Sequence, residues 1–183
     1  MTIAGKIEST IAIPGGVSVT MNDGTVTVKG PRGELSRNFA YPRVSISIAE
    51  GEVAVSSEYP RTEDKAMVGT YVAHINNMIK GVTVGFTYTL KVVFSHFPMK
   101  VAVKDGRVEI SNYMGGHAPR YANIAGACKV KVSGTDVTVE GNSIEDCGQT
   151  AANLEKATSR VGFDKRTFQD GIYIVHKSHK VRE

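Results

Sequence analysis

"VSVTMNDGTVTVKGPRG" (17–33) and "VAVKDGRVEISNYMGG" (101–116) share one pattern: an alternating apolar and polar run, an Asp-Gly pair, and a second alternating run. Alternation with a period of two is typical of half-buried strands. An Asp-Gly pair supplies the positive φ values that two-residue hairpin turns require. Each stretch therefore predicts a β-hairpin, with its turn at Asp23-Gly24 in the first and at Asp105-Gly106 in the second.

The similarity between the two halves continues along the chain. "VSISIAEGEVAVSSE" (44–58) resembles "VKVSGTDVTVEGN" (130–142), and each predicts a second hairpin. Because the same kinds of element follow in the same order, we interpret the chain as an internal duplication.

Each pair of hairpins is followed by a stretch with helical periodicity. In the first half the apolar stripe consists of Val68, Tyr71, Val72, Ile75, Met78 and Ile79. Thr62 is expected to cap this helix and Lys80-Gly81 to end it. In the second half one face carries Cys147, Ala151, Leu154 and Thr158. Ser143 and Asp146 give that helix an S-x-x-D start signal.

The predicted fold class is α+β: two tandem repeats of one small domain, each an antiparallel sheet packed with one helix. The expected boundaries are 1–84 for the N-terminal repeat and 85–183 for the C-terminal repeat. Residues 81–98 are rich in β-branched and aromatic residues and predict a strand that leaves the first domain and enters the second. Residues 1–16, a strand or arm, and the tail 161–183 fall outside the predicted repeat.

The charge of the chain is unevenly distributed. Of 183 residues, 41% are hydrophobic, which suffices for ordinary cores, and the net charge is +4. Residues 1–84 hold 8 Lys+Arg and 8 Asp+Glu, whereas residues 85–183 hold 14 and 10. This asymmetry favours a polyanionic partner for the second domain.

Several classes of protein do not fit the sequence. No apolar run is long enough for a membrane-spanning helix, and "MTIAGKIEST" (1–10) lacks the pattern of a secretory signal. Cys128 and Cys147 have no C-x-x-C spacing and are expected to be reduced core thiols of a cytoplasmic protein. His176 and His179 form H-x-x-H without the further ligands that a metal needs. With no nucleophile–base pair or nucleotide-binding motif, the sequence predicts no enzyme, no cofactor and no metal.

The loop "SNYMGGHAPR" (111–120) has the glycines and the arginine that a phosphate site uses. It lines up, however, with "KGPRGELSRN" (29–38), so that Asn112 matches Gly30 and Gly115 matches Gly33. Glycine and asparagine best tolerate positive φ, which predicts a turn that the fold requires in both copies. Three of its side chains remain candidates for RNA contact: Tyr113, His117 and Arg120.

The tail combines basic and aromatic residues. From Arg160 to Arg182 there are six Lys/Arg against two Asp, with Phe163, Phe168 and Tyr173 among them. Cations meet phosphates and rings stack on unpaired bases, so the pattern favours RNA binding. The alternative is that Phe168 pins the tail to the second domain, and both roles can coexist in a strand. The predicted phosphate contacts are Arg120, Arg160, Lys165, Arg166 and Lys177.

Five segments together resemble a known family: "VTVKGPRGELSR" (26–37), "NNMIKGVTVGF" (76–86), "SHFPMKV" (95–101), "VTVEGNSIEDCGQTAANLEKATS" (137–159) and "RTFQDGIYIV" (166–175). In this order they resemble the large-subunit ribosomal protein six family in its archaeal form. The resemblance implies a duplicated α+β fold and a non-catalytic, structural role in the large ribosomal subunit. It also implies binding of large-subunit ribosomal RNA mainly through the C-terminal domain, near the sarcin-ricin loop and the docking region of translational GTPases, with ribosomal proteins as neighbours.

The chain departs from the family at two neighbouring positions. The family pattern N-[FY]-[LM]-G-E-K becomes "NYMGGH" (112–117), so Gly116 replaces a glutamate and His117 replaces a lysine. On the resemblance and on chemistry, His96 and Phe97 are predicted as polar or stacking contacts. Gln149 and Asn153 lie one helical turn apart and are expected to face RNA or solvent. The alternative to RNA binding is a duplicated module for protein–protein interaction whose basic tail only aids solubility.

Overall fold

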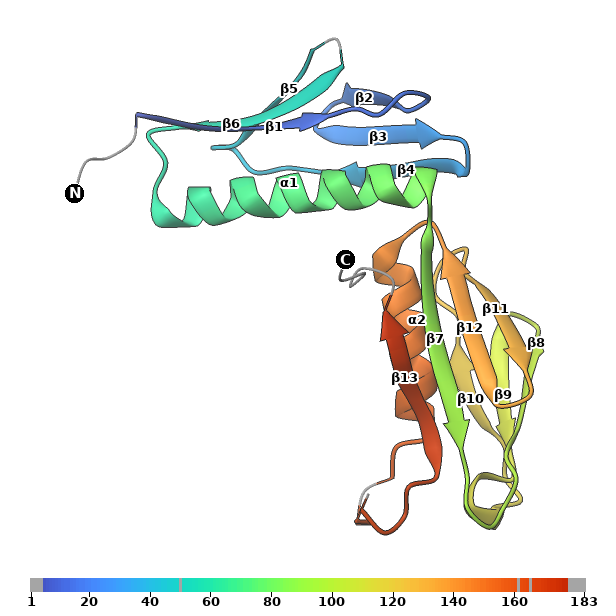
Figure 1. The fold of residues 1–183 in the computed structure, drawn as a ribbon. Coiled ribbons are helices and arrows are strands. Elements are labelled where there is room, and N and C mark those ends of the chain that lie inside the picture. The colour runs from blue at the N-terminus through green and yellow to red at the C-terminus, as the bar shows by residue number, and fades with distance from the viewer. Residues whose placement is uncertain (1–4, 50, 161, 165, 178–183) are drawn as a thin grey trace. The chain divides into compact units, whose positions relative to one another are not determined.

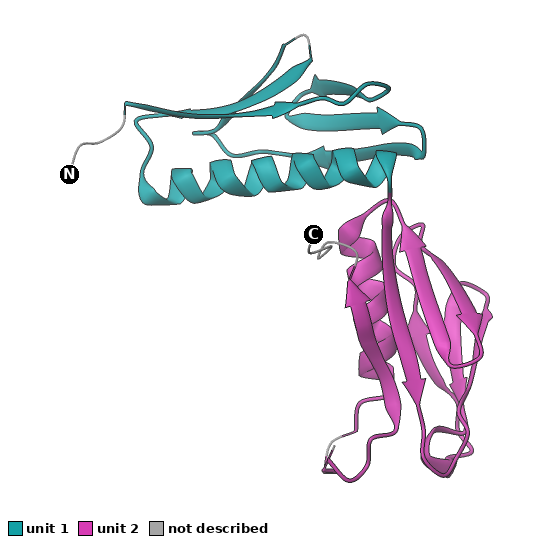
Figure 2. Ribbon diagram, viewed as in Figure 1, with its two compact units in different colours: residues 1–84 teal, residues 85–183 magenta. Residues whose placement is uncertain are grey.

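The structure, a computed structural model, describes residues 5–49, 51–160, 162–164 and 166–177. The chain divides into two compact units, residues 1–84 (unit 1) and residues 85–183 (unit 2) (Figure 2). Each unit contains antiparallel sheets and one long helix (Figure 1). The predicted duplicated α+β fold is confirmed, with the refinement that each unit holds two small sheets rather than one.

Unit 1 is built from six strands and a helix. They are β1 (Lys6–Ala12), β2 (Ser18–Asn22), β3 (Thr25–Gly30), β4 (Gly33–Asn38), β5 (Ser45–Ala49), β6 (Glu52–Glu58) and α1 (Thr62–Thr83). The sheets have the orders β1-β6-β5 and β2-β3-β4. The predicted stripe of α1 packs with the inward side chains of β3 and β6, among them Val28 and Val53, to form the core.

Unit 2 repeats this plan with one strand more. Its elements are β7 (Phe86–Val93), β8 (Lys100–Lys104), β9 (Arg107–Ser111), the 3-10 turn η1 (Tyr113–Gly115), β10 (Arg120–Asn123), β11 (Lys129–Ser133), β12 (Asp136–Gly141), α2 (Ile144–Ala157) and β13 (Gly171–Lys177). The sheets have the orders β11-β12-β7-β13 and β10-β9-β8. All four residues of the predicted α2 face are buried.

Strand pairing shows that the repeat begins earlier in each half than the sequence pattern indicates. β1 pairs antiparallel with β6 in unit 1, and β7 pairs antiparallel with β12 in unit 2. Residues 6–12 therefore belong to the first copy, and residues 86–93 form the first strand of the second copy. The element outside the repeat is β13, which adds to the free side of β7.

Both predicted Asp-Gly turns are confirmed. Asp23 and Gly24 have φ values of 46° and 75°, and Asp105 and Gly106 have 47° and 73°. These positive values connect β2 to β3 and β8 to β9 as two-residue hairpins.

The start of α1 differs from the prediction. Arg61, not Thr62, is the N-cap, and its backbone N–H donates to the carboxylate of Asp64 at 2.8 Å. The hydroxyl of Tyr41 and the guanidinium of Arg43 donate to the same carboxylate at 3.0 and 3.4 Å. These donors favour the charged form and lower the pKa of Asp64. A buried carboxylate thus replaces the expected hydroxyl cap.

The end of α1 also lies beyond the predicted residue. The helix continues through the buried Gly81 to Thr83, and Gly85 then adopts a φ of +81°. In α2 the predicted cap is confirmed, since the Ser143 hydroxyl accepts from the N–H of Asp146 at 3.2 Å.

Gly30 and Asn112 occupy matching positions for different reasons. Asn112 has a φ of +60°, as predicted, whereas Gly30 has no positive φ. A Cβ on Gly30 would lie 2.6 Å from Cγ2 and 2.9 Å from the carbonyl oxygen of Val82. The second matched pair, Gly33 and Gly115, does share positive φ values of 137° and 75°. Gly30 is therefore explained by the close approach of β3 to the end of α1.

We expect Gly30→Ala to lower the free energy of unfolding of unit 1 by about 2 kcal/mol, because the new methyl group must displace helix backbone. The measurement is urea unfolding followed by circular dichroism. Gly69→Ala is the matched control, since nothing lies near a Cβ at that helical position. It should raise stability by about 0.5–1 kcal/mol. Equal, small effects of the two substitutions would contradict the close-contact explanation.

Candidate nucleic-acid interface

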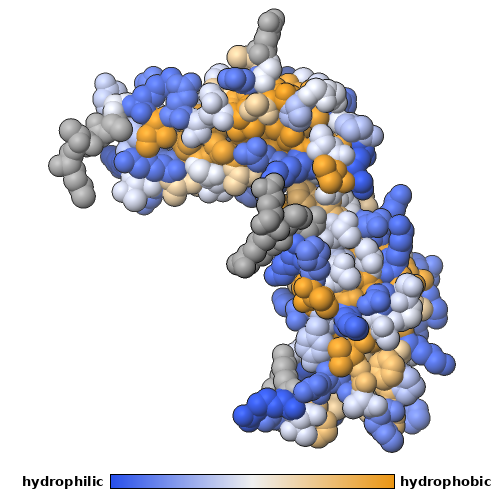
Figure 3. Space-filling model, viewed as in Figure 1, coloured by the Kyte–Doolittle hydropathy of each residue, from blue (hydrophilic) through white to orange (hydrophobic). Residues whose placement is uncertain are grey.

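Three loops of unit 2 lie together at one end of the unit (Figure 1). They are residues 94–99 between β7 and β8, residues 112–119 between β9 and β10, and the described residues between α2 and β13, which are 158–160, 162–164 and 166–170. We call them the loop end. Apolar and hydrophilic side chains lie side by side on the face of unit 2 in view (Figure 3). Seven of the twelve predicted RNA-binding residues belong to the loop end: His96, Phe97, Tyr113, His117, Arg160, Arg166 and Phe168.

Tyr113 holds two of these loops together. Its side chain is buried, and its hydroxyl donates to the carbonyl oxygen of Thr158 at 2.6 Å. The Thr158 hydroxyl in turn accepts from the N–H of Ile172 at 2.9 Å, at the start of β13. Burial raises the pKa of Tyr113. The structure thus places Tyr113 largely beneath the surface, where it packs between the two loops.

Asp170 joins two of the sequence motifs that are distant in the chain. Its carboxylate accepts from the backbone N–H of Ser95 at 3.0 Å and from the Ser95 hydroxyl at 2.8 Å. "SHFP" (95–98) is therefore anchored to "FQDG" (168–171). This contact gives both motifs a structural purpose in shaping the loop end.

The loop 94–99 presents an exposed aromatic pair. Phe97 is 41% exposed and makes an edge contact with the ring of His96, their centroids 4.7 Å apart. The other side of Phe97 lies on Gly115, where an added Cβ would come within 3.1–3.3 Å of the ring. The glycine of η1 thus has an architectural role, as predicted: its left-handed backbone gives Phe97 a surface to lie on.

Arg120 has a different environment from the one that its sequence context indicates. Its Nη1 donates to the carbonyl oxygens of Ala157 at 2.8 Å and Ser159 at 3.3 Å, and its guanidinium lies 4.3 Å from the centroid of Tyr113. Carbonyls at a helix C-terminus lack intrahelical partners and favour a cation. Because its guanidinium is used within the fold, we infer that Arg120 stabilises the end of α2, and its predicted contact with a phosphate stays a prediction.

Arg160 and Arg166 are the exposed arginines of the loop 158–170. The Arg160 guanidinium lies 4.1 Å from the centroid of Phe163 and contacts the sulfur of Met114 at 3.7 Å. Arg166 is 91% exposed and pairs with Asp164 at 2.9 Å, and this hydrogen bond raises its pKa. Both cations point to solvent, but the charge of Arg166 is partly balanced.

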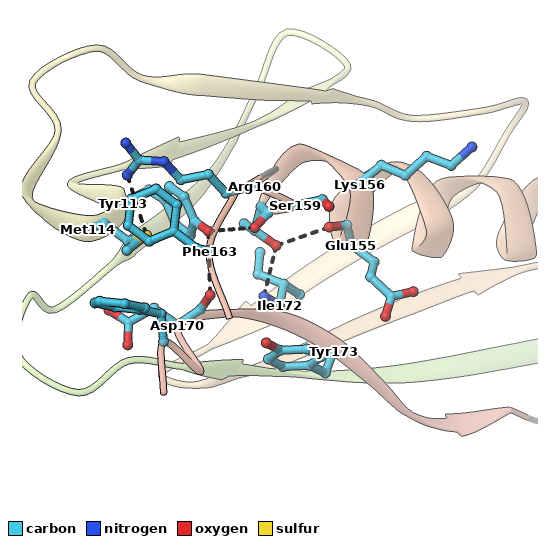
Figure 4. A pocket seen from close by; sticks show the side chains of 12 residues that line it. Tyr113, Met114, Glu155, Lys156, Ser159, Arg160, Phe163, Asp170, Ile172 and Tyr173 are labelled. Carbon is cyan, nitrogen blue, oxygen red and sulfur yellow. Dashed lines mark hydrogen bonds between the residues drawn. The ribbon is translucent and has the colours of Figure 1, made fainter. Parts of the chain in front are cut away.

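A pocket of about 230 Å³ opens between the end of α2 and the start of β13 (Figure 4). Its lining includes aromatic rings and both charges: Tyr113, Met114, Glu155, Lys156, Thr158, Ser159, Arg160, Phe163, Phe168, Asp170, Ile172 and Tyr173. Lys156 is a cation of this site that the sequence interpretation missed. The sequence did not mark Lys156 as a site residue, because a lysine in the last turn of a helix is equally expected from the helix dipole.

Three of the other predicted residues, Gln149, Asn153 and Lys177, lie away from the loop end. Gln149 and Asn153 share a face of α2, as predicted, and their amides form a hydrogen bond of 2.8 Å, while Asn153 also donates to the carbonyl of Asn123. Lys177 is exposed at the last residue of β13, about 20 Å along the strand from its start. Lys165 lies outside the described residues.

The two cysteines lie against each other in unit 2. Their sulfurs are 3.5 Å apart, both are free thiols, and Cys147 is fully buried. Burial raises the pKa of both thiols, that of Cys147 to about 12, which disfavours the nucleophilic thiolate. Gly141 faces both sulfurs and leaves room for them. Cys147 lies in the core and Cys128 packs against it partly buried, which agrees with the prediction that both are core thiols.

In the parts of the chain that the structure describes, no group of three or more His, Cys, Asp or Glu side chains could hold a metal ion; His179 of the H-x-x-H motif is outside those parts. Within the same limits, every helix is too short or too polar to cross a lipid bilayer.

Comparison with known proteins decides the family. The model of the family described as "Ribosomal protein L6" matches residues 13–85 and residues 97–171, one match over most of each unit. The chain belongs to the ribosomal protein L6 family. The resemblance stated from the sequence motifs is thereby confirmed, and the chain is a structural component of the large ribosomal subunit.

Relatives in this ribosomal protein family match almost from end to end. Large ribosomal subunit protein uL6 of Methanobrevibacter smithii is 51% identical over 177 residues, which cover 97% of this chain and 99% of the relative. The protein of the same description from Methanosarcina mazei is 49% identical, covering 94% and 98%. That from Methanococcus vannielii is 48% identical, covering 99% and 100%. All three organisms are archaea, in agreement with the archaeal form predicted from the motifs.

Proposed function

We propose that this member of the ribosomal protein L6 family binds large-subunit ribosomal RNA through unit 2, mainly with its loop end. The resemblance of its motifs supports a position near the sarcin-ricin loop and the docking region of translational GTPases. Unit 1, with balanced charges, is available for neighbouring ribosomal proteins. We place the protein, accordingly, in the cytoplasm on the ribosome.

The observation that carries the proposal is the mixture of side chains at the loop end. Arg160 and Arg166 are exposed beside exposed rings, with Phe97, Phe163 and Phe168 between 38% and 47% exposed. Arginine forms two parallel hydrogen bonds to a phosphate, and aromatic faces stack on unpaired bases. Exposed apolar side chains that gather at one place are typical of an interaction site. The arrangement thus suits an RNA with both backbone and single-stranded bases in reach.

The test is a salt titration of rRNA binding by the full chain and by the double variant Arg160→Ala/Arg166→Ala. Each lost phosphate contact reduces the slope of log affinity against log salt by about 0.7–0.9, so the double variant should lose about 1.5. The matched control is Lys65→Ala/Lys80→Ala, which removes two exposed charges from α1 of unit 1. Its slope should equal that of the wild type.

Two outcomes would contradict the proposal. If the control pair changed the slope as much as the loop-end pair, RNA would be bound by net charge and not by the loop end. If the wild-type chain bound no rRNA, yet retained a protein partner after nuclease treatment, the protein-interaction alternative would replace RNA binding.

A further inference from the structure

The pocket between α2 and β13 has the size of a single ring system. Its volume is about 230 Å³, below the range of about 300–1,000 Å³ typical of pockets that take drug-sized molecules. It opens on the loop end, beside the exposed side chain of Arg160 (Figure 4). A ligand that fills it must therefore be small, or be one small part of a larger molecule.

Aromatic rings form much of the wall of this pocket. The ring of Tyr173 lies over Gly171, and it comes within about 3.3 Å of the position that a Cβ on this glycine would take. The Tyr173 hydroxyl donates to the carbonyl oxygen of Gln169 at 3.0 Å. Phe163 and Phe168 meet edge to face, 5.1 Å between centroids. Rings held in this way offer flat surfaces at little entropic cost, which suits stacking of a planar ligand.

The charges around the pocket match a nucleotide. Lys156 and Arg160 are exposed lining cations and can meet a phosphate, as can the exposed hydroxyl of Ser159. Glu155 is an exposed hydrogen-bond acceptor among the lining residues. A carboxylate accepts hydrogen bonds from the amino groups of bases, whereas an ionised phosphate has no donor to offer it. Cations and a carboxylate around one aromatic pocket favour a ligand with an anionic part and a donor-bearing planar part.

We propose that this pocket takes one unpaired base of the RNA, stacked on the aromatic wall, with its amino group toward Glu155 and its phosphate toward Arg160. Bases that carry an amino group, adenine, guanine and cytosine, are preferred over uracil. This inference rests on the proposed function and adds to it the recognition of a single extruded nucleotide.

The first test uses mononucleotides with the full chain, because they require no knowledge of the rRNA site. Amide shifts of Arg160, Phe163 and Tyr173 in NMR spectra should move on addition of 5′-AMP or 5′-CMP, and less with 5′-UMP. Ribose 5-phosphate at the same concentration should leave them in place. Equal shifts with ribose 5-phosphate would show a phosphate site without base recognition, and no shifts with any nucleotide would show no site; either overturns the inference.

The second test separates the inference from the proposed function. Reagents that modify the base-pairing edges of RNA are applied to rRNA bound by the wild type, by Phe168→Ala and by the control Tyr121→Ala, a 58% exposed ring on β10 that does not line the pocket. One base should be protected by the wild type and the control and become at least several-fold more reactive with Phe168→Ala. If all three bind rRNA and protect the same bases, the inference fails alone; if the wild type binds no rRNA, the proposed function fails.

Discussion

Replacing Tyr113 with alanine is expected to lower the free energy of unfolding of unit 2 by about 3–5 kcal/mol. The side chain is 7% exposed, so its removal leaves a cavity under the loop end. It also leaves the carbonyl oxygen of Thr158 without its 2.6 Å hydrogen bond and the Arg120 guanidinium without the ring 4.3 Å from it. Loops 112–119 and 158–170 lose one of the contacts that join them, and the pocket that Tyr113 lines should lose its shape.

The measurement is urea unfolding with hydrogen exchange detected by mass spectrometry, which reports peptides of the two units separately. Tyr113→Phe serves as the control: it keeps the ring and removes only the hydroxyl, for a cost of about 1–2 kcal/mol. Peptides of unit 1 should be unaffected by either substitution. If Tyr113→Ala lowered the free energy of unfolding no more than Tyr113→Phe does, the ring would contribute nothing to stability beyond the hydrogen bond of the hydroxyl.

Local patterns in the sequence predicted the elements that depend on neighbouring residues. The Asp23-Gly24 and Asp105-Gly106 turns follow from the φ values that a two-residue hairpin demands, and the buried face of α2 follows from a spacing of three to four residues. The cap at Ser143 is likewise local. Each of these features is decided within a few residues, so the information is present in a short window of sequence.

Features that depend on residues distant in the chain were predicted poorly, because a short window of sequence does not contain both partners. The pairing of β1 with β6 joins Lys6 to Glu58, and no local pattern in residues 1–16 indicates that partner. The cap at Arg61 depends on Asp64, whose carboxylate is buried only because Tyr41 and Arg43 arrive from another loop. A carboxylate at the start of a helix is otherwise explained by the dipole alone.

The candidate site shows the same division. Basic residues among aromatic residues in the tail predicted RNA binding, and this stays a prediction. The structure shows that Arg160, Phe163 and Phe168 are exposed. Sequence alone, however, assigned Arg120 and Arg160 the same role. What distinguishes them is the end of α2, which lies 37 residues from Arg120 and only three from Arg160. Because the helix end brings unpaired carbonyls to Arg120, that cation is used in the fold, while Arg160 reaches the surface.

The contacts of Arg120 predict a large loss of stability in unit 2 when its side chain is removed. Arg120→Ala should lower the free energy of unfolding of unit 2 by about 2–3 kcal/mol, since it removes charge-assisted hydrogen bonds to the carbonyls of Ala157 and Ser159 and a cation–π contact with Tyr113. Arg120→Lys should recover only part of this loss, because an ammonium group cannot reproduce the planar guanidinium contact. The stability is measured by urea unfolding, as for Tyr113.

The same variant separates a structural role from an RNA-binding role. Under conditions in which unit 2 stays folded, Arg120→Ala should leave the salt dependence of rRNA binding unchanged, because its guanidinium is already bound to carbonyl oxygens at the end of α2. Arg160→Ala should do the reverse, with little loss of stability and a slope smaller by about 0.7–0.9. If Arg120→Ala reduced the slope as much as Arg160→Ala while stability hardly changed, Arg120 would be a phosphate contact and the helix-end role assigned to it would be wrong.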